Sequence, residues 1–261
     1  MKLEVLDLDA VGEKHGSILF VHGALHGAWC WNRFMKYFSE HGYDCHAFSF
    51  RGHGKSEGAE RINDFSLDDY VADLSQVLDS MKETPIVVAH SLGGMVLQRY
   101  MGEHAPVKSI SQAVFLASMP VGGTTTGDQL KMLFKHWKAT KVMMDINGGK
   151  PFDAARLKDA VIFSERLSEA DVKPYVNLIK PESTRVGKEQ AKPATNVFNV
   201  GIPVHIIGSN GDWMFSDQSE NSASYKVKPI MLDGLCHDMM LDPEWEKAAK
   251  AVLESIESSE K

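Results

Sequence analysis

The sequence predicts an α/β fold in which a doubly wound, mostly parallel sheet is interrupted by an inserted helical cap. Three observations lead to this prediction. Apolar runs alternate along the chain with stretches whose apolar residues recur at helical spacing. Several of the runs are continuously apolar, which is typical of strands buried on both faces of a parallel sheet. The alternation stops near residue 119 and resumes near residue 203.

The composition limits what kind of protein this is. A chain of 261 residues with 43% hydrophobic and 24% charged residues is typical of a globular protein with a sizeable core. The net charge of −7 gives no reason to expect a nucleic-acid partner. Three widely spaced cysteines fit a reducing compartment. Because no apolar run is long enough to cross a bilayer and no leader pattern is present, we expect a cytoplasmic protein without stable membrane insertion.

The first part of the chain predicts five strands. Residues 3–8 alternate between apolar and polar side chains, as in a strand at the edge of a sheet. The runs at 17–21 and 86–88 are apolar apart from Ser17 and predict central strands. The five strands are expected at residues 3–8, 17–21, 44–50, 86–88 and 112–117.

Three helices are expected between these strands. The first carries Trp31, Phe34 and Phe38 on one face and closes at Gly42. Ser66 is a favourable N-cap for the second helix, which is expected to run to about residue 82. The third follows the 86–88 strand and is expected to reach about residue 103.

Residues 120–200 predict the helical cap, and residues 1–119 and 201–261 form the core. The insertion reads as helices separated by Gly and Pro, without a convincing central strand. Its Met- and aromatic-rich stretches, at 132–137 and 143–144, suit an apolar ligand, although ordinary core packing explains any one of these side chains equally well. Amphipathic helices packed on the sheet are the alternative to a cap. The sheet pattern then resumes at 203–208 and 225–231, and a last helix is expected at 243–257.

The stretch Ala89-His90-Ser91-Leu92-Gly93-Gly94 predicts the nucleophile. It follows a strand and precedes a helical pattern, the context in which a serine between small residues forms a nucleophile elbow. Small flanks are needed because strand and helix pass close together there. The first small residue is Ala instead of Gly, and a serine in a plain turn is the alternative interpretation.

A serine nucleophile needs a base, and the base needs a group that fixes its tautomer. In a doubly wound sheet these partners follow the carboxyl ends of strands. His237 follows the last predicted strand, and Asp212 follows the 203–208 strand. Asp217 and Asp233 are the alternatives for the acid, and the position at a strand end favours Asp212.

Backbone N–H groups are expected to bind the oxyanion of an acyl-transfer reaction. Leu92 follows the predicted nucleophile at the start of a helix, so its N–H is one candidate. Ala24 follows His22-Gly23 in the loop after the 17–21 strand and offers the second. A tight turn that needs glycine flexibility is the alternative reason for Gly23, and both can hold together.

Side chains around these groups are expected to contact a small-molecule substrate. The predicted substrate-binding residues are His22, Gly23, His90 and Trp213. No metal is expected, because nothing completes a ligand set around His22 and His26. No cofactor is expected either, since residues 122–127 lack the glycine spacing and lysine of a phosphate-binding loop.

Together these motifs resemble the α/β-hydrolase superfamily over essentially the whole chain, in the order Ser91, Asp212, His237. The turn at residues 51–56 adds to the resemblance. The loop at residues 22–31 is similar to the opening loop of plant methyl esterases and hydroxynitrile lyases. The lyases typically have Thr at the position of Gly23 and Lys at that of Asp238, so both residues argue against cyanohydrin cleavage.

The resemblance implies a serine hydrolase that cleaves a carboxylic ester, lactone or thioester through an acyl-enzyme. Ser91 would attack the carbonyl carbon, His237 would take its proton, and Asp212 would orient the imidazole. Two alternatives use the same scaffold. One is a small-molecule binding protein with vestigial catalysis, and the other is a cofactor-independent lyase or oxygenase with His237 as its base.

Overall fold

The computed structural model describes residues 1–261 apart from 125–126, 128–129, 131–133, 161 and 260–261. Its described strands form one seven-stranded sheet in the order β1-β3-β2-β4-β5-β6-β7. Strand β1 (Glu4–Leu8) pairs antiparallel with β3 (Tyr43–Ser49), and every other pairing is parallel. The predicted mostly parallel α/β sheet is therefore confirmed, including the edge strand at the N-terminus.

The remaining strands lie close to their predicted positions, except at the C-terminal edge. They are β2 (Gly16–Val21), β4 (Ile86–His90), β5 (Gln112–Leu116), β6 (Val204–Ser209) and β7 (Ile230–Leu232). The described helices of the core are η1 (Ala28–Trp31), α1 (Asn32–Glu40), η2 (Ala59–Asp64), α2 (Leu67–Ser80), α3 (Leu92–Glu103), α9 (Ser219–Tyr225), η5 (Met239–Leu241) and α10 (Trp245–Ser258).

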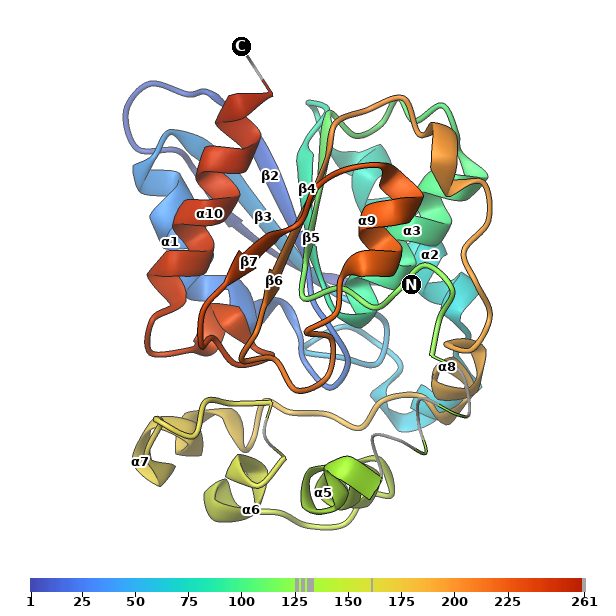
Figure 1. The fold of residues 1–261 in the computed structure, drawn as a ribbon, viewed down its shortest axis with the longest axis vertical. Coiled ribbons are helices and arrows are strands. Elements are labelled where there is room, and N and C mark those ends of the chain that lie inside the picture. Colours follow the sequence, from blue (N-terminus) through green and yellow to red (C-terminus); the bar gives the residue numbers. More distant parts are fainter. Residues whose placement is uncertain (125–126, 128–129, 131–133, 161, 260–261) are drawn as a thin grey trace.

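Helices cover both faces of the sheet (Figure 1). Helices α1 and α10 lie on one face, where Trp31, Phe34 and Phe38 are fully buried against Phe20 of β2. Helices α2, α3 and α9 lie on the other. Side chains of the central strands alternate between these two apolar layers, as burial on both faces of a parallel sheet requires.

Helix α2 begins where the sequence predicts. The Ser66 side chain accepts a hydrogen bond from the Asp69 N–H, and the Asp69 carboxylate accepts one from the Ser66 N–H. This capping box satisfies two backbone groups that would otherwise lack a partner. It fixes the start of the helix next to the turn after β3, close to the site described below.

The predicted strand at 225–231 is wrong for its first five residues, 225–229. Residues up to Tyr225 belong to α9, and Lys226 ends that helix in the left-handed conformation, with φ of 56°. Strand β7 then begins only at Ile230. The apolar residues Tyr225 and Val227 pack against the core from a helix end, a role that an alternating pattern does not distinguish from a strand.

Between β5 and β6 the described residues form helices and no strand. These helices are α5 (Trp137–Asn147), α6 (Ala154–Lys158), α7 (Glu169–Val172), η3 (Lys173–Tyr175), α8 (Thr184–Glu189) and η4 (Val197–Asn199). Figure 1 shows α5, α6 and α7 as a separate layer below the sheet. Parts of two stretches discussed above, residues 125–126 and 132–133, lie outside the described residues.

Hydrogen bonds connect this helical layer to the core at three places. The Asp238 N–H donates to the Ile162 carbonyl oxygen at 3.0 Å, and the Lys180 N–H donates to that of Leu25 at 2.9 Å. The Tyr70 hydroxyl donates to the buried Glu182 carboxylate at 2.6 Å. The layer therefore contacts the loops that follow β2 and β7.

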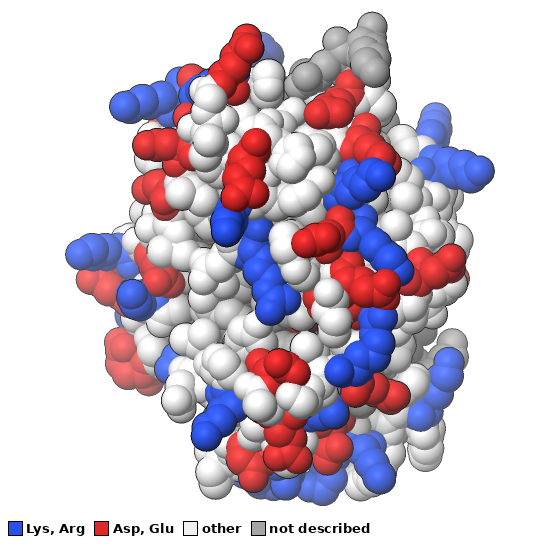
Figure 2. Space-filling model, turned by 90° about the vertical axis from the view of Figure 1, so that its left-hand side faces the viewer, with Lys and Arg blue, Asp and Glu red and all other residues white. Residues whose placement is uncertain are grey.

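Acidic and basic side chains are interspersed over the face formed by α1 and α10 (Figure 2). One surface network on this side of the core joins Arg166 to Asp242 and Glu244, and Glu244 also pairs with Lys247. Among the described helices, none is long and apolar enough to cross a membrane.

Candidate active site

Ser91 lies at the apex of a strained turn between β4 and α3. Its φ of 51° and ψ of −118° are unfavourable for a residue with a side chain. Backbone hydrogen bonds hold the turn: the Ser91 N–H donates to Leu116 O at 3.2 Å, and the Gly94 N–H donates to Ser91 O at 3.0 Å. The geometry is that of a nucleophile elbow, which presents the serine hydroxyl at the carboxyl edge of the sheet.

Small residues are required around this turn for a steric reason. A β-carbon on Gly94 would overlap the side chain of Ser118. A β-carbon on Gly23, in the loop after β2, would lie 3.0 Å from the Ser91 β-carbon and 2.8 Å from His90 Nδ1. Both glycines therefore let neighbouring segments approach Ser91 more closely than any side chain permits.

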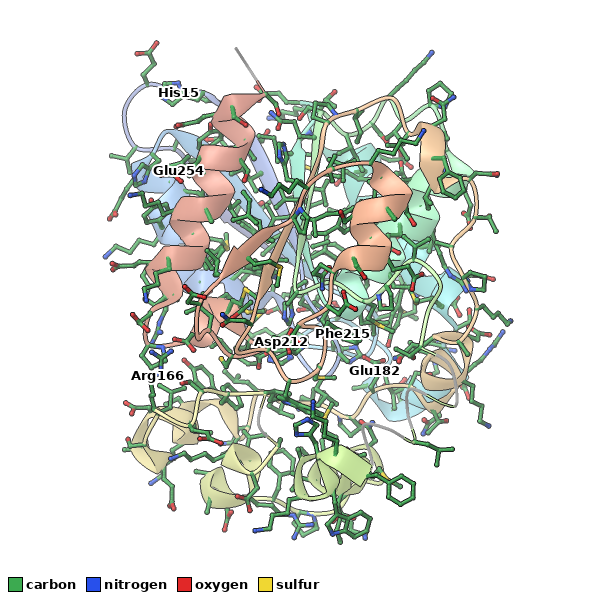
Figure 3. The ribbon with its side chains drawn as sticks, in the orientation of Figure 1. His15, Arg166, Glu182, Asp212, Phe215 and Glu254 are labelled. Carbon is green, nitrogen blue, oxygen red and sulfur yellow. The ribbon has the colours of Figure 1, made fainter. Side chains whose placement is uncertain are left out.

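His237 and Asp212 meet Ser91 at this edge. The Ser91 Oγ lies 3.0 Å from His237 Nε2, and His237 Nδ1 lies 2.9 Å from Asp212 Oδ2. All three side chains are buried, with 6%, 3% and 2% of the Ser91, His237 and Asp212 residues exposed. In Figure 3 Asp212 lies at the lower edge of the sheet, facing the helical layer, with Phe215 beside it. The structure thus brings together residues from three loops far apart in sequence.

Charges in this trio make the imidazole of His237 a stronger proton acceptor. Burial opposes the charged form of His237, but attraction to Asp212 outweighs burial and raises the pKa of His237. Burial likewise opposes ionisation of Asp212, yet His237 and the N–H groups of Met214 and Phe215 lower the pKa of Asp212. Asp212 is therefore an anion that fixes the N–H of His237 on Nδ1 and leaves Nε2 to accept the serine proton.

The two alternative acids lie elsewhere. Asp217 accepts a hydrogen bond from the Ser219 N–H at 2.9 Å, at the start of α9. Asp233 pairs with the Asn210 side chain on the surface. Only Asp212 contacts His237 among these three carboxylates, as its position after β6 predicts.

A small cavity is lined by Ser91. Its volume is about 20 Å³, roughly the space of one water molecule. Met143 and Ile162 line it from the helical layer, and Met214 lines it from the loop after β6. The complete lining is Ala24, Leu25, His26, His90, Ser91, Met143, Ile162, Met214, His237 and Asp238.

The predicted oxyanion donors lie on either side of Ser91. The Ala24 N–H has no hydrogen-bond acceptor among the described residues, and Ala24 lines the cavity with Ser91. Leu92 is the first residue of α3, and N–H groups in the first turn of a helix have no partner within the helix. Both groups remain available to an oxygen atom bound next to Ser91.

The predicted substrate-binding residues occupy different places. His90 lines the cavity, and Gly23 lies directly behind Ser91. His22 is fully buried: its Nε2 accepts a hydrogen bond from the Phe50 N–H at 3.0 Å, and its Nδ1 donates to Gly23 O at 2.7 Å. Trp213 lines a separate cavity of about 480 Å³ between the core and the helical layer, where its ring lies 4.6 Å from that of His136.

Two residues that line the cavity have a relationship that the sequence did not reveal. His26 and Asp238 contact one another there, with His26 Nε2 3.0 Å from Asp238 Oδ2. Each follows a strand at the carboxyl edge, which is the signal that could have paired them. From the sequence, His26 was of interest only as a possible metal ligand. Asp238 was of interest only because the hydroxynitrile lyases have Lys at that position.

One group of side chains in the described part of the chain has the spacing of a metal site. Candidate ligand atoms of His90, His237 and Asp238 lie within 4.8 Å of one another. However, His237 already contacts Ser91 and Asp212 through its two nitrogens. A cation at this position would have to break one of those contacts, so the donor set fits proton transfer better than metal binding.

Comparisons with known proteins agree with this fold. A family model described as the alpha/beta hydrolase fold matches residues 16–242. The probable esterase PIR7A of Oryza sativa subsp. japonica is 30% identical over 193 residues, which cover 71% of this chain and 68% of that protein. Putative methylesterase 15, chloroplastic, of Arabidopsis thaliana is 32% identical over 114 residues, 43% of this chain but only 25% of that protein.

A solved structure shows the same fold at low identity. A mutant of epoxide hydrolase from Solanum tuberosum superposes on this chain with a TM-score of 0.73 and 18% identity. The superposition covers 98% of this chain and 96% of that chain. The shared architecture therefore extends over nearly the whole molecule.

Proposed function

Because the chain belongs to the α/β-hydrolase fold family, we propose that it is a serine hydrolase that cleaves a carboxylic ester of a small molecule. One observation carries the proposal: the Ser91 hydroxyl, at the apex of a strained turn, lies 3.0 Å from an imidazole whose other nitrogen contacts a buried carboxylate. Esterase names among the relatives support the choice of an ester over other acyl derivatives.

In the proposed reaction Ser91 Oγ attacks the ester carbonyl carbon as His237 Nε2 takes the hydroxyl proton. Asp212 stabilises the imidazolium that forms. The N–H groups of Ala24 and Leu92 donate to the oxyanion, which is stabilised because these dipoles are already oriented. The tetrahedral intermediate expels the alcohol, which receives the proton from His237. Water then attacks the acyl-enzyme by the same route and releases the acid.

The lining of the cavity supports a small ester with an apolar acyl group. Leu25, Met143, Ile162 and Met214 present apolar side chains toward Ser91. A cavity of about 20 Å³ is too small for any ester, so residues 120–200 act as a cap whose side chains move to admit substrate. A methyl ester leaves the smallest alcohol, and the methylesterase names among the relatives support this choice.

A fluorophosphonate probe tests the proposal directly, because it modifies only an activated serine. We expect one covalent adduct on the wild-type protein by intact mass, and none on Ser91→Ala or His237→Ala. Exposed Ser168→Ala is the control and should label like wild type. Absence of an adduct on folded wild-type protein would contradict the proposal and favour a small-molecule binding protein on this scaffold.

A further inference from the structure

His26 and Asp238 form a second histidine–carboxylate contact in the wall of the cavity that holds Ser91. His26 Nε2 lies 3.0 Å from Asp238 Oδ2, and His26 Nδ1 lies 2.6 Å from the carbonyl oxygen of Ala24. Both side chains are buried, with 2% and 0% of each residue exposed. Neither residue takes part in the proton transfer between Ser91, His237 and Asp212.

The partners of His26 determine its protonation. Both are acceptors, since a carbonyl oxygen and an ionised carboxylate have no proton to donate. A neutral imidazole has one N–H and satisfies only one of them. His26 therefore makes both hydrogen bonds only as an imidazolium, or the carboxyl group of Asp238 must carry a proton.

Neighbouring histidines show that this arrangement is specific to His26. His22 has one donor partner and one acceptor partner, so its ring is satisfied when neutral. His90 donates from Nε2 to His237 O at 3.0 Å, while its Nδ1 has no partner among the described residues. Burial lowers the pKa of His22 and lowers that of His90 to about 3. Two histidines beside the pair are thus neutral.

The surroundings favour the charged form of the pair. Burial opposes a charge on His26, but attraction and hydrogen bonding to Asp238 outweigh it and raise the pKa of His26. Burial also opposes ionisation of Asp238, and His26 lowers the pKa of Asp238. The indole ring of Trp29 stacks on His26, with ring centroids 5.2 Å apart, which suits a cation. The other titratable groups around the pair are His22, His90, His237, Cys30 and Cys236.

Building on the proposed esterase function, we propose that the His26 imidazolium and the Asp238 carboxylate form a positioning ion pair that fixes the Ala24 backbone relative to His237. His26 holds the carbonyl group of Ala24, which limits rotation of the residue whose N–H is offered to the oxyanion. Asp238 follows His237 directly, and its own N–H is bonded to Ile162 O. One side-chain contact thus links the loops after β2 and β7 across the site.

The charges are also arranged to suit the reaction. In the proposed reaction, negative charge develops on the oxyanion next to Ala24, on the same side as the His26 imidazolium. Positive charge develops on His237, beside the Asp238 carboxylate. The second oxygen of that carboxylate, Oδ1, has no hydrogen-bond partner among the described residues and lies 4.0 Å from His90 Nε2. Loss of the pair should therefore slow the chemical step more than it weakens substrate binding.

Nitrogen-15 NMR of the imidazole rings tests the protonation without any substrate. At a pH of about 8, where a free histidine is neutral, we expect both nitrogens of His26 to carry protons in the wild-type protein. His26→Gln identifies the signals. In Asp238→Asn one nitrogen should lose its proton at this pH. A single-tautomer, neutral His26 in the wild-type protein would overturn the inference, whether or not the protein hydrolyses esters.

Kinetics test the positioning role. We expect Asp238→Asn and His26→Gln each to lower kcat, and the rate of fluorophosphonate labelling, about 10- to 100-fold with KM changed little. The double variant should be no slower than the slower single variant, because both remove one contact. Asp73→Asn is the matched control. Asp73 lies in α2, and its buried carboxylate pairs with Arg51, so this variant should keep wild-type kcat.

A pH profile separates positioning from general damage to the fold. Asp238 favours the protonated form of His237, so its loss should move the acid limb of kcat/KM to lower pH. His26→Gln supplies the second variant should Asp238→Asn fold poorly. Wild-type kcat and an unmoved acid limb in folded variants would overturn the positioning role. Loss of labelling in the wild-type protein would instead overturn the proposed function.

Discussion

The backbone of Gly93 lies against the carbonyl oxygen of His22, so closely that a β-carbon on Gly93 would overlap that oxygen. The same β-carbon would lie 2.8 Å from the carbonyl oxygen of Val21. Helix α3 therefore packs directly on the end of β2, and this contact sets the distance between Ser91 and the loop that carries Ala24.

Gly93→Ala should destabilise the protein, because two backbone oxygens at the end of β2 cannot move aside as a side chain would. We expect a loss of about 1–3 kcal/mol in the free energy of unfolding, measured by urea denaturation. Gly187→Ala in α8 is the control, since its β-carbon would meet open space and alanine favours a helix. Equal stability of the two variants would contradict the close packing.

Asp212→Asn should lower kcat by about 10³- to 10⁴-fold while the fold is retained. An amide at this position neither stabilises the His237 imidazolium nor fixes the productive tautomer. The measurement is steady-state hydrolysis of a p-nitrophenyl ester. Asp217→Asn and Asp233→Asn serve as controls, because their carboxylates contact other groups, and each should retain wild-type kcat. A similar loss in either control would argue against the choice of Asp212.

The pH dependence of kcat/KM should show an acid limb set by His237. Only the neutral imidazole accepts the serine proton, so activity falls as pH decreases through the pKa of His237. Asp212 raises that pKa from its usual value near 6.5, so the midpoint of the limb should lie above about 6.5. In Asp212→Asn the residual activity should show a limb at lower pH, and an unchanged midpoint would contradict the assignment.

Met143→Ala should widen the acyl pocket, because the Met143 side chain lines the cavity that holds Ser91. We expect the ratio of kcat/KM for a medium-chain ester to that for an acetate ester to rise about tenfold. The adjacent Met144→Ala is the matched control, since 63% of Met144 is exposed. A flat chain-length profile in both variants would argue against an acyl pocket at this position.

Most of the sheet was predictable because its strands are buried on both faces and therefore read as apolar runs. Strand β4 and the Ser66 cap of α2 lie where local chemistry predicts them. The strand expected at 225–231 was wrong because Tyr225 and Val227 bury apolar area from the end of a helix. The short apolar pattern at 225–231 indicates burial but not the type of element. The left-handed conformation of Lys226 ends α9 there, before the strand begins.

The part of the candidate site that lies at the ends of strands was predictable from the sequence. Ser91, Asp212 and His237 each follow a strand, so the topology brings them to one edge. Their catalytic roles, and the division of the chain at residues 120 and 200, stay predictions. The contact of Met143 and Ile162 with the cavity could not be predicted. The periodicity of the insertion indicates helices but not where those helices pack on the core.

The long excursion between β5 and β6 has a consequence for how such a protein diversifies. The chain leaves the sheet after Leu116 and returns at Val204 on the neighbouring strand, where Leu116 pairs with Ile207. Because departure and return are adjacent, genetic insertions, deletions or exchanges within the excursion leave the strand register intact. Selection on ligand preference can therefore proceed in one stretch of the gene while the positions of Ser91, Asp212 and His237 are inherited unchanged.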